Sequence, residues 1–213
     1  MSKIWIVDNS SLFIEGVKKV LHHTRGLKLD NHGSSGKELY TFLESDCPDL
    51  LILDIQLKGE SGFAILQFLK DHHPALPVLV ITHKDLNVFA VRSIRAGARG
   101  YIPKNQLSGD LLVQALRYII DNNKPFIIPE VASLLADRID HGNGDAPRHT
   151  SLSDRELEVF CCIALGLATQ EIADHFHISH HTVHTYRARI REKMGMKSNV
   201  EIIRYALAYN LIS

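Results

Sequence analysis

The chain has 213 residues, of which 45% are hydrophobic and 23% charged, a composition typical of a globular protein with one large or two modest domains. Its 24 basic and 24 acidic residues balance, so the charge of the whole chain identifies no partner, and any nucleic-acid surface must be local. The three cysteines lack C-x-x-C spacing and no apolar run is long enough for a membrane span, which argues against a disulfide or zinc framework and favours a soluble, cytoplasmic protein without membrane contact.

Short apolar runs rich in Val, Ile and Leu alternate with stretches of helical periodicity over the first part of the chain. Four of these runs cover residues 4–7, 50–53, 78–81 and 101–103. Such runs are typical of parallel strands that are buried on both faces. The alternation predicts a doubly wound (βα)5 domain of the α/β class over residues 1–122.

One polar residue directly follows each of these four runs, namely Asp8, Asp54, Thr82 and Lys104. Ligands of open parallel sheets bind at the carboxyl ends of the strands, so we expect these side chains to meet at one edge. Two carboxylates, a hydroxyl and an ammonium suit a divalent cation and a phosphoryl group. Taken singly, each has a simpler interpretation, because an Asp or Thr after a strand often caps the next helix and a Lys is usually solvated.

Residues 123–150 predict a linker that contains a short helix over residues 131–139. The segment 141–147, rich in Gly and ending in Pro, breaks every periodicity. A second domain is expected over residues 151–213. Its first helix should begin with a capping box formed by Ser153 and Glu156, and its last helix with a second box formed by Ser198 and Glu201.

The helices of this second domain are short and closely spaced, and the pattern predicts a small all-α domain with a helix-turn-helix. Residues 182–197 contain five basic side chains and one acidic side chain, whereas residues 151–213 as a whole carry seven of each. The positive charge is therefore concentrated where a helix could meet phosphates. The simpler alternative is an ordinary solvated face.

These motifs resemble the receiver domain of two-component response regulators over residues 1–120 and the LuxR-type helix-turn-helix over residues 151–213. The first resemblance rests on W-I-V-D-N-S (5–10), L-I-L-D-I-Q-L-K-G-E-S-G (51–62), V-I-T-H (80–83) and A-G-A-R-G-Y-I-P-K (96–104). The second rests on L-S-D-R-E-L-E-V (152–159), G-L-A-T-Q-E-I-A (166–173) and I-S-H-H-T-V-H-T-Y-R-A-R-I-R-E-K-M (178–194). The architecture is similar to the NarL/FixJ subfamily, whose receiver has a flavodoxin-like fold.

The resemblance implies a role for single residues of the first domain. Asp54 would accept a phosphoryl group from a sensor histidine kinase, and Lys104 and Thr82 would contact its oxygens. Tyr101 would be the switch aromatic, which changes rotamer when Thr82 moves inward on phosphorylation. The receiver would catalyse only its own phosphorylation and dephosphorylation, so we do not expect an enzyme in the usual sense.

The resemblance also implies a Mg²⁺ site made by Asp8, Asp54 and the backbone carbonyl of Gln56. Most receivers have a second acid beside the first, but here Asn9 stands at that position. One formal charge is lost, so we expect weak Mg²⁺ binding in which Asn9 takes part weakly or indirectly. The motif also departs from the family at Leu57-Lys58, Asn105 and His83.

For the second domain, the resemblance implies DNA as the partner. His184, Thr185 and Ala188 lie opposite the apolar stripe of their helix and would approach base edges, whereas Arg187, Arg191 and Lys193 would meet phosphates. A homodimer is expected in the active form, with RNA polymerase as a further candidate partner.

Two other functions remain open at this stage. One is a phosphorylation-independent transcription factor, in which a degenerate receiver serves as a dimerisation or ligand-binding module. The other is an enzyme of the doubly wound class that uses Asp8 and Asp54 to hydrolyse a phosphate ester. The attached helix-turn-helix argues against the enzyme.

Overall fold

A computed structural model of the chain describes residues 1–57, 60–140, 147–209 and 211–212. They form two compact units, Met1–Ala132 and Ser133–Ser213, and each is treated by itself below. Residues 141–146, most of the segment interpreted as a linker, lie outside the described residues, as does Lys58. Across the described ranges, no helix has the length and hydrophobicity needed to cross a membrane.

The first unit is built on a parallel sheet in the order β2-β1-β3-β4-β5. The strands are β1 (Ser2–Val7), β2 (Leu27–Gly33), β3 (Leu50–Leu53), β4 (Val78–Thr82) and β5 (Gly100–Pro103). Every residue of β3, β4 and β5 is buried, because helices cover both faces of the sheet. The doubly wound α/β fold is therefore confirmed. Thr82 is the last residue of β4 rather than the first residue after it.

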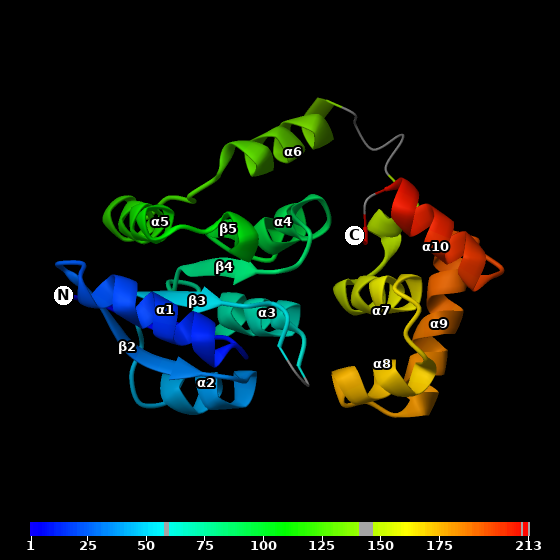
Figure 1. Cartoon of the computed structure of the whole chain (residues 1–213), viewed down its shortest axis with the longest axis horizontal. Coiled ribbons are helices and arrows are strands. Elements are labelled where there is room, and N and C mark those ends of the chain that lie inside the picture. Colours follow the sequence, from blue (N-terminus) through cyan, green and yellow to red (C-terminus); the bar gives the residue numbers. More distant parts are fainter. Residues whose placement is uncertain (58–59, 141–146, 210, 213) are drawn as a thin grey trace. The chain divides into compact units, whose positions relative to one another are not determined.

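Helices cover the sheet in two groups (Figure 1). Helices α1 (Ser11–His22) and α5 (Gly109–Asn122) lie together on one face, and a short 3₁₀ turn, η1 (Lys104–Gln106), precedes α5. On the other face lie α2 (Gly36–Leu43), α3 (Gly62–His72) and α4 (Leu86–Arg95). Aromatic contacts join this second group: Tyr40 meets Phe68 at a ring separation of 4.4 Å, and Phe63 meets Phe89 at 6.2 Å.

Each of the helices α1 to α5 begins after a polar side chain that accepts a hydrogen bond from a backbone N–H of the first turn. These caps are Ser10, Ser35, Ser61, Asp85 and Ser108. Because each helix starts shortly after a strand ends, the caps hold the connecting loops close to the carboxyl edge of the sheet. The predicted site residues lie at this same edge.

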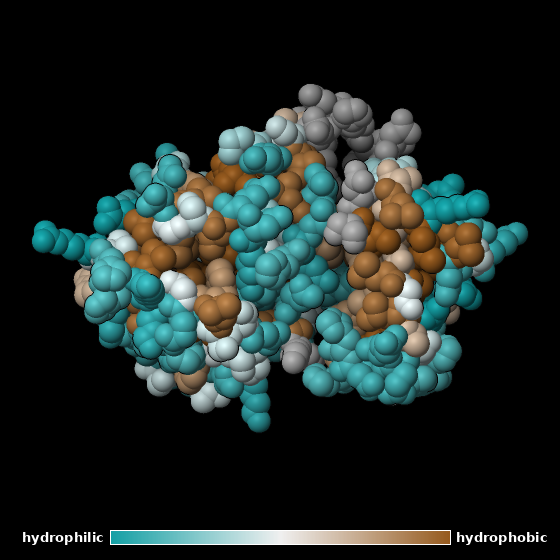
Figure 2. Space-filling view, in the orientation of Figure 1, coloured by the Kyte–Doolittle hydropathy of each residue, from teal (hydrophilic) through white to brown (hydrophobic). Residues whose placement is uncertain are grey.

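The second unit consists of short helices packed around an apolar core. Its elements are η2 (Arg148–Ser151), α7 (Asp154–Ala164), α8 (Thr169–Phe176), α9 (His180–Met194) and α10 (Asn199–Ala208). The helix expected over residues 131–139 is α6 (Pro129–Asp140), which spans the division between the two units. The outer surface of α8 is hydrophilic (Figure 2), because its buried residues are limited to Ile172, Ala173 and Phe176.

Local capping in the second unit agrees with the sequence at one helix and differs at another. At α7, Ser153 and Glu156 form the predicted reciprocal capping box. At α10, Ser198 caps the helix as expected, but the Glu201 carboxylate accepts from the N–H of Lys197 instead of from that of Ser198. The second capping box was therefore a wrong prediction. The Glu201 carboxylate bonds to Lys197, the residue before the cap, because the N–H of Lys197 is a donor at a comparable distance along the chain.

Candidate functional site

The four predicted polar residues, which lie at the ends of their strands or directly after them, meet at the carboxyl edge of the sheet. The Lys104 ammonium lies 2.6 Å from Oδ2 of Asp8 and 2.7 Å from Oδ2 of Asp54. The Thr82 hydroxyl donates a 2.6 Å hydrogen bond to Oδ1 of Asp54. Strands β1, β3, β4 and β5 bring these residues together because the sheet places their carboxyl ends side by side.

The electrostatics of this cluster depend on one cation shared by two buried acids. The side chains of Asp8, Asp54 and Lys104 are 1%, 6% and 5% exposed, so solvent screens them little. Burial raises the pKa of Asp8, and the repulsion of Asp54 adds to this, although the hydrogen bonds from Lys104 and Ser10 oppose the change. A second cation at this edge would relieve the repulsion between the carboxylates.

The backbone around Asp54 holds its carboxylate in place. The N–H of Gln56 donates to Oδ1 of Asp54 at 2.8 Å, and the N–H of Ser10 donates to Oδ1 of Asp8 at 2.8 Å. Both carboxylates keep an oxygen that faces Lys104. The acceptor oxygens are therefore oriented by the loops themselves, as a group-transfer site requires.

The set of donors fits Mg²⁺ in its chemistry. Two carboxylates and the carbonyl of Gln56 are hard oxygen ligands, and Mg²⁺ usually keeps several waters beside one or two carboxylates. No group of three or more His, Cys, Asp or Glu side chains capable of holding a metal occurs among the described residues, so a site here would need those waters. When bound, Mg²⁺ would neutralise charge on a transferring phosphoryl group.

Asn9 makes a contact at this edge that the sequence did not reveal. Its side-chain Nδ2 donates a 3.0 Å hydrogen bond to the backbone carbonyl of Gln56, the same oxygen that the resemblance assigns to Mg²⁺. The replacement of an acid by Asn9 was visible in the sequence. The partner was not, because it lies 47 residues away on the loop after β3.

Tyr101 is fully buried in β5, and its hydroxyl donates a 2.7 Å hydrogen bond to the carbonyl of Lys84. Burial raises the pKa of Tyr101 well above its ordinary value, with smaller contributions from the Asp85 and Asp54 carboxylates. Tyr101 is therefore a neutral donor. The N–H of Lys84 in turn lies 3.3 Å from the Thr82 hydroxyl, so the aromatic and the acceptor carboxylate share one loop.

A cavity of about 440 Å³ opens beside the carboxylate cluster between α1 and α5. Hydrophobic side chains gather there (Figure 2), including Leu12, which is 83% exposed, and Phe13, whose ring centre lies 4.6 Å from the Lys104 ammonium. His83 and Lys104 are among the polar residues that line the same cavity. The apolar groove thus leads to the cluster of charged residues.

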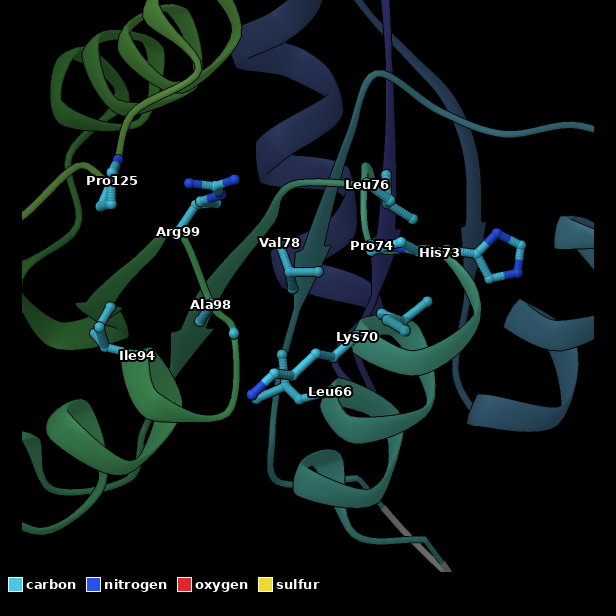
Figure 3. A pocket seen from close by; sticks show the side chains of 12 residues that line it. Leu66, Lys70, His73, Pro74, Leu76, Val78, Ile94, Ala98, Arg99 and Pro125 are labelled. Atoms are coloured by element: carbon cyan, nitrogen blue, oxygen red, sulfur yellow. The ribbon is translucent and has the colours of Figure 1, made fainter.

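A second cavity of about 300 Å³ lies where β4 and β5 begin, at the opposite edge of the sheet (Figure 3). Lys70 and Arg99 contribute cationic groups to its lining. In this view Arg99 lies at the upper end of the cavity and the Lys70 ammonium at the lower end beside Leu66, with Val78 and Ala98 between them. Since the two cations lie at opposite ends, this cavity offers no focused site for an anion.

In the second unit, α8 and α9 form a helix-turn-helix. His177 ends α8 in the left-handed conformation (φ 50°), and Ser179 caps α9. Val183, Ile190 and Met194 of α9 are buried, whereas His184 and Ala188 are exposed and Thr185 is half-buried on the outer side. The expected division of α9 into an apolar stripe and an open face is confirmed.

The basic residues of α9 differ in what they contact within the unit. Arg187 and Arg191 both donate to Oδ1 of Asn199, at 3.3 Å each, and Arg187 also donates to the hydroxyl of Thr169. The Lys193 ammonium lies 2.6 Å from the Glu156 carboxylate. Arg191 and Lys193 are exposed, and Arg187 is half-buried. These contacts could not be predicted from the amino-acid pattern, because the partners come from other helices.

Comparisons with known proteins match both units. Residues 4–117 match the family model of the response regulator receiver domain, and residues 150–206 match that of bacterial regulatory proteins of the luxR family. The oxygen regulatory protein NreC of Staphylococcus aureus is 30% identical over 215 residues, which cover 99% of each chain. A structure of RcsB from Salmonella typhimurium has a TM-score of 0.72 at 21% identity and covers 98% of both chains. RcsB from Salmonella enterica serovar Typhimurium, bound to promoter rprA in the presence of the phosphomimetic BeF₃⁻, has a TM-score of 0.67 at 22% identity, covering 96% of this chain and 97% of that one.

Proposed function

The chain belongs to the DNA-binding response regulators that join a receiver domain to a LuxR-type domain, and from this premise we propose that Asp54 is the residue whose phosphorylation regulates DNA binding. The observation that carries the proposal is the position of the Asp54 carboxylate. It follows β3 at the carboxyl edge of the sheet and contacts Lys104, Thr82 and the N–H of Gln56. Asp8 reaches the same cluster through Lys104.

The chemistry is a phosphoryl transfer to a carboxylate. An oxygen of Asp54 attacks the phosphorus of a phosphohistidine on a sensor histidine kinase. The P–N bond breaks with the imidazole as leaving group, and an aspartyl phosphate forms. Lys104 and the Thr82 hydroxyl contact the new phosphoryl oxygens. Asp8, Asp54 and the carbonyl of Gln56 would hold a Mg²⁺ ion, which would supply charge neutralisation when bound. Both matched families are those of regulatory proteins, which favours a transcription regulator over an enzyme that hydrolyses a phosphate ester.

We propose that Tyr101 transmits the modification to the outer surface. A phosphoryl group held by Thr82 would alter the loop that carries Lys84, to which the Tyr101 hydroxyl is bonded. The surface of α4, β5 and α5 would then change and support a homodimer. Two copies of α9 could engage half-sites about 10 base pairs apart, the spacing of a two-fold helix-turn-helix dimer.

On the DNA side, we propose that α9 enters the major groove. His184, Thr185 and Ala188 would face base edges, and Arg187, Arg191 and Lys193 would meet phosphates. The proposed division of the chain is a receiver over residues 1–122, a linker with a short helix over 123–150 and a DNA-binding domain over 151–213. Because the proposed role is exerted on DNA, we propose a cytoplasmic location, where RNA polymerase is a further proposed partner.

The experiment compares two aspartates that flank the same strand. Asp49 precedes β3 and Asp54 follows it, so Asp49→Ala is a matched control for Asp54→Ala. Acetyl phosphate carrying a radioactive phosphoryl group should label wild type and Asp49→Ala with a hydroxylamine-sensitive bond. Asp54→Ala should take up no label, and its DNA affinity should not respond to acetyl phosphate. Equal labelling of all three chains would refute the assignment.

A second candidate function has its own support in Asn9. The Asn9 amide already bonds to the carbonyl proposed for Mg²⁺, so the receiver could have lost metal-dependent phosphorylation and serve as a dimerisation or ligand-binding module. The same labelling separates the two candidates. Under the second one, wild type takes up no label and binds DNA with an affinity that acetyl phosphate leaves unchanged.

A further inference from the structure

We infer that the Asn9 side chain is a latch on the loop after β3, which holds the Gln56 carbonyl and competes with Mg²⁺ for its oxygen. The inference deepens the proposed function and rests on it, because it concerns the metal site of that proposed receiver. It gives Asn9 a positioning role that goes beyond the loss of one negative charge.

The direction of the Asn9 hydrogen bond is settled by chemistry. A backbone carbonyl can only accept, so the atom 3.0 Å from it must be the amide nitrogen of Asn9 rather than its oxygen. An ionised aspartate at the same position has only acceptors and could not make this bond. The contact therefore depends on having an amide in place of the carboxylate that most receivers carry.

Both polar groups of the Gln56 backbone are engaged. The N–H donates to Asp54 at 2.8 Å, while the carbonyl accepts from Asn9 at 3.0 Å. Asn9 follows β1 and Gln56 follows β3, and these two strands are neighbours in the sheet. The bond thus ties two adjacent loops together at the edge where the acidic side chains lie.

Competition with a metal follows from the place that the amide occupies. Mg²⁺ binds its oxygens at about 2 Å and demands near-ideal octahedral geometry. A cation close to the Gln56 carbonyl would meet the N–H group of Asn9, whose hydrogen carries partial positive charge and points at the same oxygen. We therefore expect the Asn9 side chain to rotate away when the metal binds, at the cost of one hydrogen bond.

Loss of charge and competition are separable by substitution. Asn9→Ala removes the hydrogen bond without restoring the charge. Asn9→Asp removes the hydrogen bond and also restores the charge. If only the charge mattered, Asn9→Ala would bind metal no better than wild type. If the latch competes, Asn9→Ala binds metal more tightly, and Asn9→Asp more tightly still.

The test uses Mn²⁺, which shares the preference of Mg²⁺ for carboxylate, carbonyl and water ligands. Free Mn²⁺ is measured by electron paramagnetic resonance during titration of wild type, Asn9→Ala, Asn9→Asp and the control Asn105→Ala, which changes an exposed amide beside Lys104. A hydrogen bond of ordinary net strength predicts an affinity about two- to tenfold higher for Asn9→Ala than for wild type. Asn105→Ala should match wild type. An Asn9→Ala affinity equal to or below that of wild type would overturn the inference.

A second measurement uses the wild-type protein alone, so it does not depend on whether a variant folds. In the ¹⁵N–¹H spectrum of the wild-type protein, the side-chain amide signals of Asn9 should shift as Mg²⁺ reaches saturation, because their hydrogen bond is released. Unmoved Asn9 signals at saturation would also overturn the latch. Failure of the proposed function looks different: no chain would bind Mn²⁺ and Asp54 would take up no label, whereas failure of the latch alone leaves both intact.

Discussion

The hydroxyl of Tyr101 donates a 2.7 Å hydrogen bond to the backbone carbonyl of Lys84. The N–H of Lys84 lies 3.3 Å from the hydroxyl of Thr82, which itself donates to Asp54. A short series of polar contacts therefore joins the proposed acceptor carboxylate to a fully buried aromatic ring. A change at Asp54 can be transmitted to β5 through this one loop.

The first prediction concerns the stability of this loop. Tyr101→Phe removes the hydroxyl and leaves the Lys84 carbonyl without its partner, so the free energy of unfolding should fall by about 1 kcal/mol. Urea denaturation measures the change. Tyr118→Phe is the control, since Tyr118 is 41% exposed and its hydroxyl can turn to water. Equal losses in the two variants would contradict the importance of the Tyr101 contact.

The second prediction concerns the lifetime of the aspartyl phosphate. His83 follows Thr82, is exposed, and lines the same cavity as Lys104. A bulky side chain there obstructs the water that would attack the phosphoryl group. His83→Ala should therefore lose label several-fold faster than wild type in a pulse-chase experiment. His73→Ala, at the opposite edge of the sheet, should not, and unchanged decay in His83→Ala would refute the shielding argument.

The third prediction concerns pH and the ion pair of Glu156 with Lys193. Burial of the Glu156 carboxyl acts to raise its pKa, but the hydrogen bonds from Lys193 and Ser153 outweigh it and hold the pKa below its ordinary value. The pair therefore stabilises the fold above the unfolded pKa of about 4.3, and this contribution is lost as pH falls through the folded pKa. Because the Lys193 side chain is 40% exposed, the contribution should be below about 1 kcal/mol.

Denaturation of wild type and Lys193→Ala between pH 3 and pH 6 tests this, with pH limits chosen around the ordinary pKa of Glu, about 4.3. The stability difference between the two chains should shrink as pH falls. Lys197→Ala, which changes an exposed lysine outside α9, is the control. A difference that stays constant over the whole range would show that the Glu156 carboxylate is not the partner that matters.

The fourth prediction concerns how α9 reads DNA. Replacing Thr185 or His184 should change which site is preferred, by about 1–3 kcal/mol per altered base contact. Replacing Arg191 or Lys193 should weaken all sites alike and reduce the salt slope by about one unit. A binding-site selection would show the assignment to be reversed if Arg191→Ala altered the preferred sequence while the Thr185 and His184 variants kept it.

The sequence was sufficient for the features that depend on local pattern. Apolar runs in the sequence predicted the buried strands. Because parallel strands end together, the polar residues at their ends could be placed at one edge, namely Asp8, Asp54, Thr82 and Lys104. The helix-turn-helix followed from closely spaced helices and a local excess of basic residues. The failed capping box at Ser198 marks the limit of this reasoning, because two backbone N–H groups competed for one carboxylate.

Contacts between residues far apart in the chain became visible only in three dimensions. Asn9 and Gln56 are 47 residues apart, and Lys193 and Glu156 are 37 apart. Which atoms meet depends on strand order, helix packing and rotamer, none of which leaves a periodic signal. Local pattern thus establishes the architecture and the place of the site. The tertiary structure decides which partner each polar group has there, because a hydrogen bond requires its two atoms to lie within about 3 Å in a suitable direction. It therefore also decides whether Asn9 only lacks the charge of an acid or competes with the metal as well.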